Sequence, residues 1–445
     1  MPKIGLVSLG CAKNLVDSEH MLALLRAAGW EITEDMAEAD VGVVNTCGFI
    51  EAAKSEAIET ILETAQYKQT GNMKGLVVTG CLVQRYAEEM QKELPEIDAI
   101  CGTGSYENIV DAANAALGGQ KAAYMADMAS AALEGDRNRL TPSYTAYFKI
   151  AEGCSNRCGY CIIPKLRGPY RSREMGALLE EARELSDAGV KELIVIAQDI
   201  TKYGMDLPEH KRLLPELLRQ LCGLDFTWIR LHYLYPDQIT DELIDVIASE
   251  PKIVKYLDIP LQHVSKRILR AMHRPGDGEE FAALIEKLRA RIPGLVLRTS
   301  LIVGLPGETE EEFAELCSFL QETQIERVGV FEFSPEEGTE AAELPDQIDA
   351  ETKANRRLIV EELQSGVLDD YNTARHGEVM DVLCEGWDDE QQLWYGRTYA
   401  DSVEVDGHVY FESDDAPEAG MFVPVRITGS LGPDLLGVRQ KGEEK

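Results

Sequence analysis

The chain has 445 residues, of which 44% are hydrophobic and 27% are charged, as in an ordinary globular protein. Its formal net charge of −34 excludes binding of nucleic acid over the whole surface, because phosphate binding requires Lys and Arg. No signal-peptide pattern and no window near about 18 apolar residues is present, so we expect a cytoplasmic protein without membrane contact. Thiols stay reduced in that compartment, so the 10 cysteines are candidate metal ligands or catalytic groups.

Residues 1–117 alternate short apolar runs with amphipathic stretches. The runs that predict strands are residues 4–9, 41–46 and 76–79. The stretches that predict helices are residues 14–28, 52–67 and 84–93. This alternation is typical of a parallel α/β domain. The pattern is lost in residues 118–143, which we interpret as a linker that could hold a marginal helix.

Residues 144–370 repeat the alternation with longer helical stretches between the apolar runs. The runs that predict strands are residues 147–151, 192–198, 228–234, 256–262, 295–304 and 327–334. Such β/α units predict a parallel barrel, complete or partial. Residues 371–445 carry short alternating runs separated by Gly and Asp turns, which predicts a small antiparallel β-barrel of OB-like size.

Three cysteines with the spacing C-x-x-x-C-x-x-C, Cys154, Cys158 and Cys161, follow the first predicted strand of this region. A structural zinc site needs four ligands, and the next histidine along the chain is as distant as His210. Three unrelated buried cysteines are another alternative. A 4Fe-4S cluster held by three thiolates fits the spacing better and leaves one iron free to bind another ligand.

This spacing, with the aromatic Tyr160 before the last cysteine, resembles the signature of radical S-adenosylmethionine (SAM) enzymes. In that family the open iron binds the amino and carboxylate groups of SAM, and an electron from the cluster releases a 5′-deoxyadenosyl radical. The resemblance implies that the three cysteines are catalytic ligands and that Tyr160 lies beside the cofactor. Residues 154–173 also hold five basic groups and no acid, so Arg171 is a candidate contact for the anionic ligands; a solvated basic loop is the alternative.

The resemblance also implies SAM contacts at the ends of later strands. The stretch LIVGLPG resembles the adenosine-binding turn of the fifth strand, with Gly304 at the turn. Gln198 and Asp199 end the second strand, where the family more generally has Gly-Gly-Glu, and Gln262 with His263 ends the fourth. The alternative for each is an ordinary polar strand end.

Cys11, Cys47 and Cys81 each follow an apolar run of the first region and each has a glycine neighbour. Their spacings of 36 and 34 residues are about one β/α unit. Because the carboxyl ends of parallel strands meet at one edge of a sheet, we expect these thiols to converge there. The alternative is three core cysteines in successive strands. Cys101 also ends a possible strand, and we favour a core role for it.

An N-terminal region with three such cysteines, a radical SAM region and a small C-terminal barrel (a TRAM domain) together resemble the methylthiotransferase family. The resemblance covers essentially the whole chain. It implies a second 4Fe-4S cluster on Cys11, Cys47 and Cys81, and the insertion of S–CH₃ at an unactivated C–H bond. It also implies an electron donor, which the sequence does not identify.

Members of this family act either on transfer RNA adenosines or on a ribosomal protein. The segment RLHYLYP (230–236) and the CIIP beginning at Cys161 resemble the RimO-type members, which modify the β-carbon of an aspartate in small-subunit ribosomal protein twelve. Residues 371–445 carry 6 basic and 16 acidic groups, which suits a basic protein partner better than phosphates. We therefore expect the ribosomal protein as substrate. Modification of transfer RNA, or an iron–sulfur electron carrier with no substrate, is the alternative.

Overall fold

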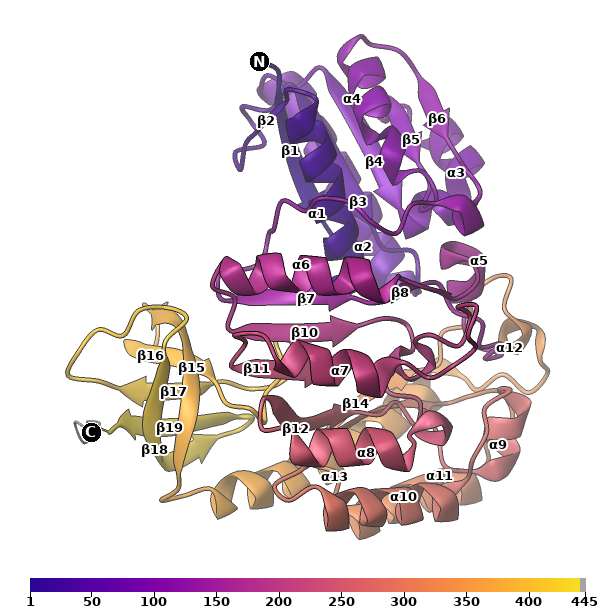
Figure 1. Cartoon of the computed structure of the whole chain (residues 1–445). Helices are drawn as coiled ribbons and strands as arrows, with labels where there is room; N and C mark the ends of the chain where they lie inside the picture. Colours follow the sequence, from indigo (N-terminus) through magenta and orange to yellow (C-terminus); the bar gives the residue numbers. More distant parts are fainter. Residues whose placement is uncertain (441–445) are drawn as a thin grey trace.

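A computed structural model describes residues 1–440. Its first sheet is entirely parallel, with the strand order β2-β1-β3-β4-β5-β6 (Figure 1). The strands are β1 (Lys3–Ser8), β2 (Glu31–Ile32), β3 (Val41–Thr46), β4 (Gly75–Gly80), β5 (Ala99–Cys101) and β6 (Ala122–Tyr124). The helices are α1 (Ala12–Ala27), α2 (Glu51–Thr70), α3 (Cys81–Glu93) and α4 (Ile109–Leu117). The predicted parallel α/β fold of this region is confirmed.

The first sheet is buried on both faces, which explains why its strands are nearly continuous apolar runs. Met21 and Leu25 of α1 pack with α4 against one face, while Ile61 of α2 and Leu82 of α3 pack against the other. Strand β6 lies inside the segment that we expected to be a linker, and it adds a sixth strand to this sheet. A run of three half-exposed residues is too short to show a strand pattern in the sequence.

The second sheet contains six parallel strands in the order β14-β13-β12-β11-β10-β7. The strands are β7 (Thr145–Lys149), β10 (Glu192–Ile196), β11 (Trp228–Leu231), β12 (Ile253–Asp258), β13 (Val296–Val303) and β14 (Arg327–Glu332). A short antiparallel pair, β8 (Ala151–Glu152) with β9 (Arg171–Ser172), lies beside the sheet. The two end strands do not pair with each other, so the predicted barrel is partial.

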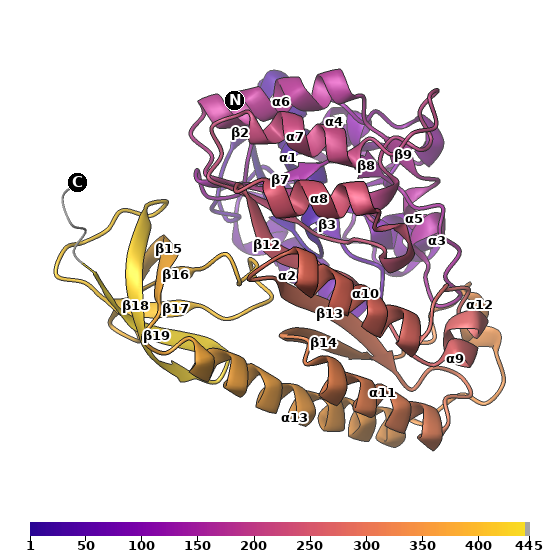
Figure 2. The ribbon, with the colours of Figure 1, turned by 60° about the horizontal axis from the view of Figure 1, so that its bottom comes forward.

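Helices cover the outer face of the second sheet (Figure 2). The covering helices are α6 (Met175–Asp187), α7 (Leu214–Cys222), α8 (Asp241–Ser249), α10 (Gly278–Arg291), α11 (Glu310–Thr323) and α13 (Ala350–Ala374). The short helices α5 (Ile163–Arg167), α9 (Lys266–Ala271) and α12 (Glu340–Glu343) lie at the end of the sheet where the cysteine loop is. The long α13 leads directly into the C-terminal barrel. No helix in the part of the chain that the structure describes is long and apolar enough to span a membrane.

The C-terminal barrel is closed and has the strand order β15-β16-β17-β19-β18. Its strands are β15 (Val379–Asp388), β16 (Leu393–Arg397), β17 (Val409–Glu412), β18 (Phe422–Leu431) and β19 (Asp434–Arg439). Four of its pairings are antiparallel, as predicted, but β17 pairs with β19 in parallel and closes the barrel.

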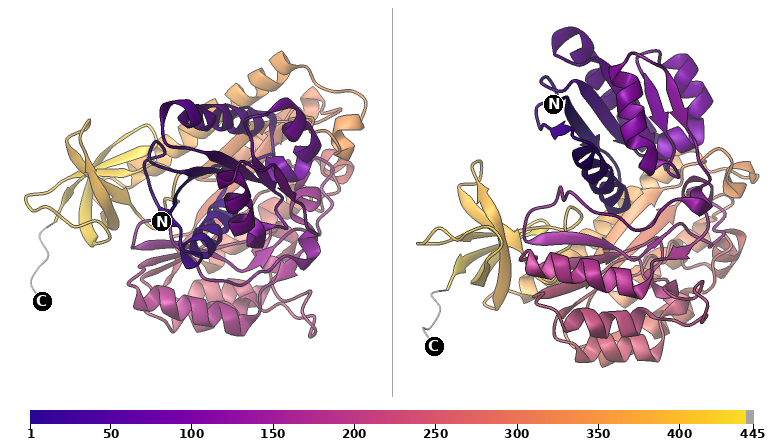
Figure 3. Two further views of the ribbon diagram at one scale, coloured as in Figure 1. Left: turned by 90° about the horizontal axis from the view of Figure 1, so that it is seen from above. Right: turned by 45° about the horizontal axis from the view of Figure 1, so that its top comes forward.

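A buried ion-pair network joins the barrel to the second sheet. Glu192 at the start of β10 accepts hydrogen bonds from Arg230 of β11 at 2.8 Å and from Arg397 of β16 at 2.7 Å. All three side chains are almost completely buried. The barrel therefore lies against the amino ends of these strands, while the first sheet packs on a different side of the molecule (Figure 3).

Candidate functional site

The loop with Cys154, Cys158 and Cys161 follows β8 and leads into α5. Three backbone hydrogen bonds fix its path. The Cys154 amide donates to the Gly168 carbonyl at 3.1 Å, and the Cys161 amide donates to the Cys158 carbonyl at 3.0 Å. The Gly159 amide donates to the Met272 carbonyl at 2.9 Å, which ties the loop to the end of α9. The three thiols are thus held by the fold before any ligand binds.

Cys158 contacts two side chains that sequence reasoning missed. Its Sγ is 2.8 Å from the Tyr235 hydroxyl and 3.8 Å from Nη1 of Arg274. Arg274 is buried and lies over the Tyr235 ring, 4.1 Å from its centre. A buried guanidinium beside a cysteine fits a site that carries negative charge when its thiols are ionised. Tyr235 belongs to the RLHYLYP segment, but nothing in the sequence near Arg274 indicates this contact.

Burial makes ionisation of these thiols unfavourable in the absence of a bound cation. It raises the pKa of Cys161 to about 12 and that of Cys154 to about 11, and the neighbouring thiols add to both shifts. Iron ions bound to the three sulfurs would supply the positive charge that stabilises the ionised thiols. The three cysteines therefore fit a 4Fe-4S cluster.

Gln198 and Asp199 lie next to the cysteine loop. Asp199 is buried and accepts a hydrogen bond at 3.1 Å from Asn156, which lies between the first two cysteines. Gln198 donates to Glu152 at 3.5 Å, and its side-chain oxygen is buried without a partner among the described residues. That unpaired acceptor suits a ligand with an amino group. Burial raises the pKa of Asp199 above the ordinary value.

Two other predicted SAM contacts, Gln262 and Gly304, lie beside and at the end of β13. Gln262 has a φ of 73°, and its backbone bridges to Ser300 and Ile302 of β13. The Gly304 amide donates to Glu308 at 2.7 Å, and a Cβ on this glycine would lie 2.3 Å from Cγ of Lys353. Lys353 therefore packs against the turn at Gly304, in the direction that a side chain would take.

The two remaining predicted SAM contacts are Tyr160, which lies in the cysteine loop, and Arg171, which lies in β9. Tyr160 packs in the apolar cluster that contains Leu305, the residue after Gly304. Arg171 donates to the Ala131 carbonyl at 2.6 Å and lines a cavity of about 160 Å³ together with Glu152. No contact between Arg171 and the thiols is present among the described residues.

The second group of cysteines occupies the carboxyl edge of the first sheet. Cys47 and Cys81 follow β3 and β4 directly, and Cys11 lies three residues after the end of β1. A Cβ on Gly10 would lie 2.9 Å from Cβ of Cys47, and a Cβ on Gly48 would lie 2.9 Å from the Cys81 carbonyl carbon. The three turns therefore converge as the spacing predicts. Burial raises the pKa of Cys81 to about 12, and the Cys47 and Cys11 thiols contribute to that shift.

Cys101 ends β5, one strand further along the same sheet. It is completely buried and packs in the core cluster of α1 and α4. Its position agrees with the core role that we favoured.

Helix α5 lies between the two groups of cysteines. It begins two residues after Cys161, and its Leu166, together with Ile162, packs against Cys81. Arg167 at its end is buried and donates to Asp17 of α1 at 2.6 Å and to Asn14 of α1 at 2.6 Å. The two cysteine groups therefore share one interface between the sheets.

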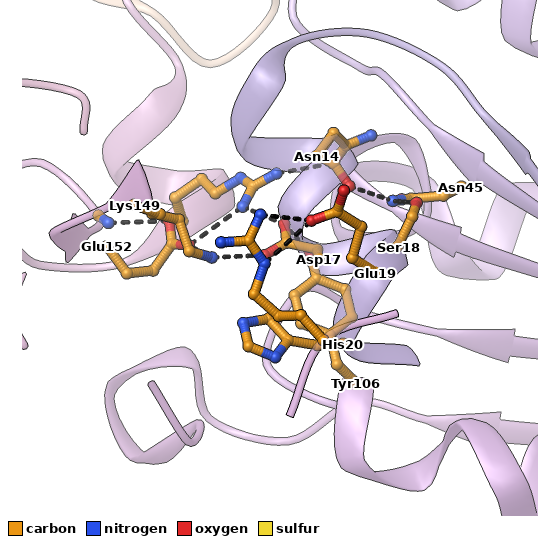
Figure 4. Close-up of polar contacts among 12 residues, drawn as sticks. Asn14, Asp17, Ser18, Glu19, His20, Asn45, Tyr106, Lys149 and Glu152 are labelled. Atoms are coloured by element: carbon orange, nitrogen blue, oxygen red, sulfur yellow. Dashed lines mark hydrogen bonds and ion pairs between the residues drawn. The ribbon is translucent and has the colours of Figure 1, made fainter. Parts of the chain in front are cut away.

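The charges at this interface are balanced. Asp17 accepts hydrogen bonds from both Arg167 and Lys149, and Glu152 also contacts both (Figure 4). Burial alone would raise the pKa of Glu152, but Lys149 and Arg167 outweigh it and hold the pKa at about 2. Two buried cations thus meet two buried carboxylates.

Within residues 1–440, no three His, Cys, Asp or Glu side chains lie close enough together to bind a single metal ion. This arrangement does not fit the zinc alternative, because a closed zinc site gathers its ligands around one ion. A four-iron cluster is larger than one ion and holds its thiolates further apart.

Three family models match this chain. Residues 3–102 match "Uncharacterized protein family UPF0004", residues 148–320 match the "Radical SAM superfamily", and residues 377–439 match the "TRAM domain". The "Ribosomal protein uS12 methylthiotransferase RimO" of Lachnoclostridium phytofermentans is 49% identical over 440 residues, which are 98% of this chain and 100% of that protein. The protein of the same description from Clostridioides difficile is 48% identical over 98% of both chains. The chain belongs to the RimO family of radical SAM methylthiotransferases.

Solved structures support the fold. The radical SAM methyltransferase TsrM from Kitasatospora setae, with cobalamin and a [4Fe-4S] cluster bound, has a TM-score of 0.55 and 13% identity. The alignment covers 77% of this chain and 74% of that chain. For a member of the RimO family, the radical SAM region implies one 4Fe-4S cluster and SAM, and the thiols of Cys154, Cys158 and Cys161 fit that cluster.

Proposed function

We propose that this protein transfers a methylthio group to the β-carbon of an aspartate in ribosomal protein uS12. The observation that carries the proposal is the 49% sequence identity, over 98% of the chain, to a protein described as a uS12 methylthiotransferase. The proposed reaction takes place in the cytoplasm and depends on an unidentified reductant.

We infer that the chain binds two 4Fe-4S clusters. Cys154, Cys158 and Cys161 would hold the cluster that works with SAM, and Cys11, Cys47 and Cys81 would hold the second. When bound, the clusters and SAM supply the radical chemistry and the sulfur that the side chains lack. The position of α5 between both groups of thiols supports this assignment, because sulfur transfer requires the two sites to serve one substrate.

The surrounding residues would orient the cofactors and keep water out. Tyr235 and Arg274 hold Cys158. The unpaired oxygen of Gln198 and the buried Asp199 are our candidates for contacts to the amino group of SAM. Tyr160, which interacts with the Cys158 side chain, and Arg171, Gln262 and Gly304 remain proposed SAM contacts.

The net charge of −34 favours a basic protein substrate over transfer RNA. Mass spectrometry of uS12 and of transfer RNA, from a strain without the gene and from the complemented strain, tests this choice. We expect uS12 to lose a mass that corresponds to SCH₃ in place of H on one aspartate, and complementation to restore it. Loss of methylthio groups from transfer RNA with uS12 unchanged would overturn the proposal.

Replacement of each group of cysteines by Ala tests the two clusters. After anaerobic reconstitution, removal of Cys11, Cys47 and Cys81 should lower bound iron from about eight to about four per chain, because each cluster holds four irons. Removal of Cys154, Cys158 and Cys161 should lower it equally and also abolish SAM cleavage. Cys101→Ala, one strand along the same sheet, is the matched control and should retain all the iron. Full iron content after removal of Cys11, Cys47 and Cys81 would contradict the second cluster.

A further inference from the structure

Lys13 is a buried cation without a carboxylate partner. It lies in the first turn of α1, two residues after Cys11, and is only 6% exposed. Its ammonium group is 3.3 Å from the centre of the Tyr233 ring, which follows β11. Among residues 1–440, no carboxylate lies within ion-pair distance of it.

Two other buried cations beside α1, Arg167 and Lys149, are paired with carboxylates. Arg167 contacts Asp17 at 2.6 Å, and Lys149 contacts Glu152 at 2.9 Å. Arg274 is buried without a carboxylate partner among the described residues, but it contacts Cys158 and the Pro260 carbonyl. An unpaired buried charge is unfavourable, and contact with an aromatic ring compensates it only in part. The start of a helix also favours anions rather than cations. Lys13 therefore lies where an additional anion would be strongly attracted.

Lys13 adjoins one group of cysteines and is connected to the other group through Tyr233. On one side it adjoins Cys11, which is exposed at the edge of the first sheet. On the other side is Tyr233, whose carbonyl accepts a hydrogen bond from Ile200 at 3.2 Å, next to Asp199. Asp199 in turn contacts the loop of the radical SAM cysteines. A group bound to Lys13 would thus lie between the two cysteine groups.

Tyr233 is held in a strained conformation at this point. Its φ of 65° is rare for a bulky residue, and its amide donates to Asp258 at 3.3 Å. Strain of this kind persists where the surrounding structure enforces it, and it occurs preferentially at functional sites. Here it places an aromatic ring against the Lys13 ammonium and fixes the direction of that side chain.

We propose that Lys13 binds the side-chain carboxylate of the substrate aspartate. This inference rests on the proposed function. The carbon that reacts is bonded to the carboxylate carbon, so a cation on the carboxylate would hold the reacting carbon between the two cysteine groups. An adenosine base has no carboxylate, so Lys13 would also select an acidic side chain over a nucleoside.

The test measures binding of purified uS12 to the anaerobically reconstituted enzyme. Two forms of uS12 are compared, one natural and one in which the aspartate that becomes methylthiolated is replaced by Asn. We expect the wild-type enzyme to bind the Asp form about tenfold more tightly, as for one charge-assisted hydrogen bond. Lys13→Met should bind both forms equally, and Lys13→Arg should recover part of the preference. Lys92→Met, which removes an exposed lysine of α3, should keep the full preference.

Iron content and the absorption spectrum of Lys13→Met should match the wild type, which shows that the clusters are retained. Equal affinity of the wild-type enzyme for both forms would overturn the inference, and this comparison is decisive even when Lys13→Met does not fold. An unchanged preference in Lys13→Met would overturn it as well. A wild-type enzyme that binds and modifies neither form would instead overturn the proposed function, and the inference with it.

Discussion

Arg167 joins two parts of the chain through one side chain. It is buried and lies at the end of α5, shortly after the loop with Cys154, Cys158 and Cys161. It contacts Asp17 and Asn14 of α1 as well as Glu152. Because a planar guanidinium presents several donors in fixed directions, one residue can satisfy all three partners. An ammonium group would make fewer of these contacts.

Replacement of Arg167 by Met should loosen the interface between the two sheets. It leaves the carboxylates of Asp17 and Glu152 with less compensation, and breaking one side of a buried ion-pair network costs about 3–5 kcal/mol. Hydrogen exchange under anaerobic conditions should show faster exchange in α1. Arg183→Met, on the exposed face of α6, is the control and should leave exchange unchanged. Equal protection of α1 in Arg167→Met and the wild type would contradict the role of this residue.

The cysteines could be predicted from the sequence because their spacing follows the period of a β/α unit or of a known loop. Their partners could not. Lys13, Tyr235 and Arg274 reach the site from different strands and helices, and a basic or aromatic residue is common in any sequence. Only the paired or unpaired state of such a residue indicates a role, and that state depends on the folded chain.

At the level of elements, the turn after each strand determines where a cysteine lies. Gly10 has a φ of 88°, and a side chain there would collide with Cys47. Gly29, in the turn after α1, has a φ of 89° and nothing within 4 Å of its Cβ position. The two glycines therefore share the backbone conformation and differ in their surroundings.

This pair allows a matched experiment. Gly29→Ala should lower the free energy of unfolding only by the strain of a left-handed alanine, about 1 kcal/mol. This variant should retain all the iron. Gly10→Ala should lower the free energy of unfolding by more than this and should displace Cys47. Because each cluster holds four irons, this variant should bind about four fewer irons than the wild type. Iron is measured after identical anaerobic reconstitution. The same iron content in both variants would show that the second group of cysteines tolerates this displacement.

Most strands could be predicted because buried parallel strands are apolar and bounded by glycine. β3 begins and ends where the apolar run 41–46 does. Strand β6 and the parallel pairing of β17 with β19 could not be predicted, since three residues give no period and a pairing direction depends on contacts between distant segments. The local hydrophobic pattern predicts that a segment is a strand, but it does not predict which strand pairs with it.

At the level of the whole molecule, Glu192 holds the C-terminal barrel against the second sheet. Burial alone would raise its pKa, but Arg397 and Arg230 outweigh it and lower the pKa from 4.5 to about 2. A carboxylate with a lowered pKa stabilises the folded state above pH 4.5, and this contribution is lost as the pH falls from 4.5 towards 2.

We therefore expect the barrel of the wild type to become accessible to an acid-active protease within this pH range. In Glu192→Gln, which leaves two buried arginines without their carboxylate, cleavage should occur already near neutral pH, as judged with a neutral protease. Glu412→Gln, an exposed change in β17, should behave as the wild type does. A barrel that resists cleavage equally in all three proteins would show that other contacts hold it in place.

The surroundings of the second group of cysteines are completed by residues made much later in synthesis. Arg85 and Lys54, on the helices beside Cys81 and Cys47, both contact Glu336 at 2.7 and 3.1 Å. At about 5–20 residues per second, a ribosome needs roughly 10–50 s to go from Cys81 to Glu336. During that time the first sheet can fold while its thiols face solvent. We therefore expect the second cluster to assemble only after the middle of the chain has been translated.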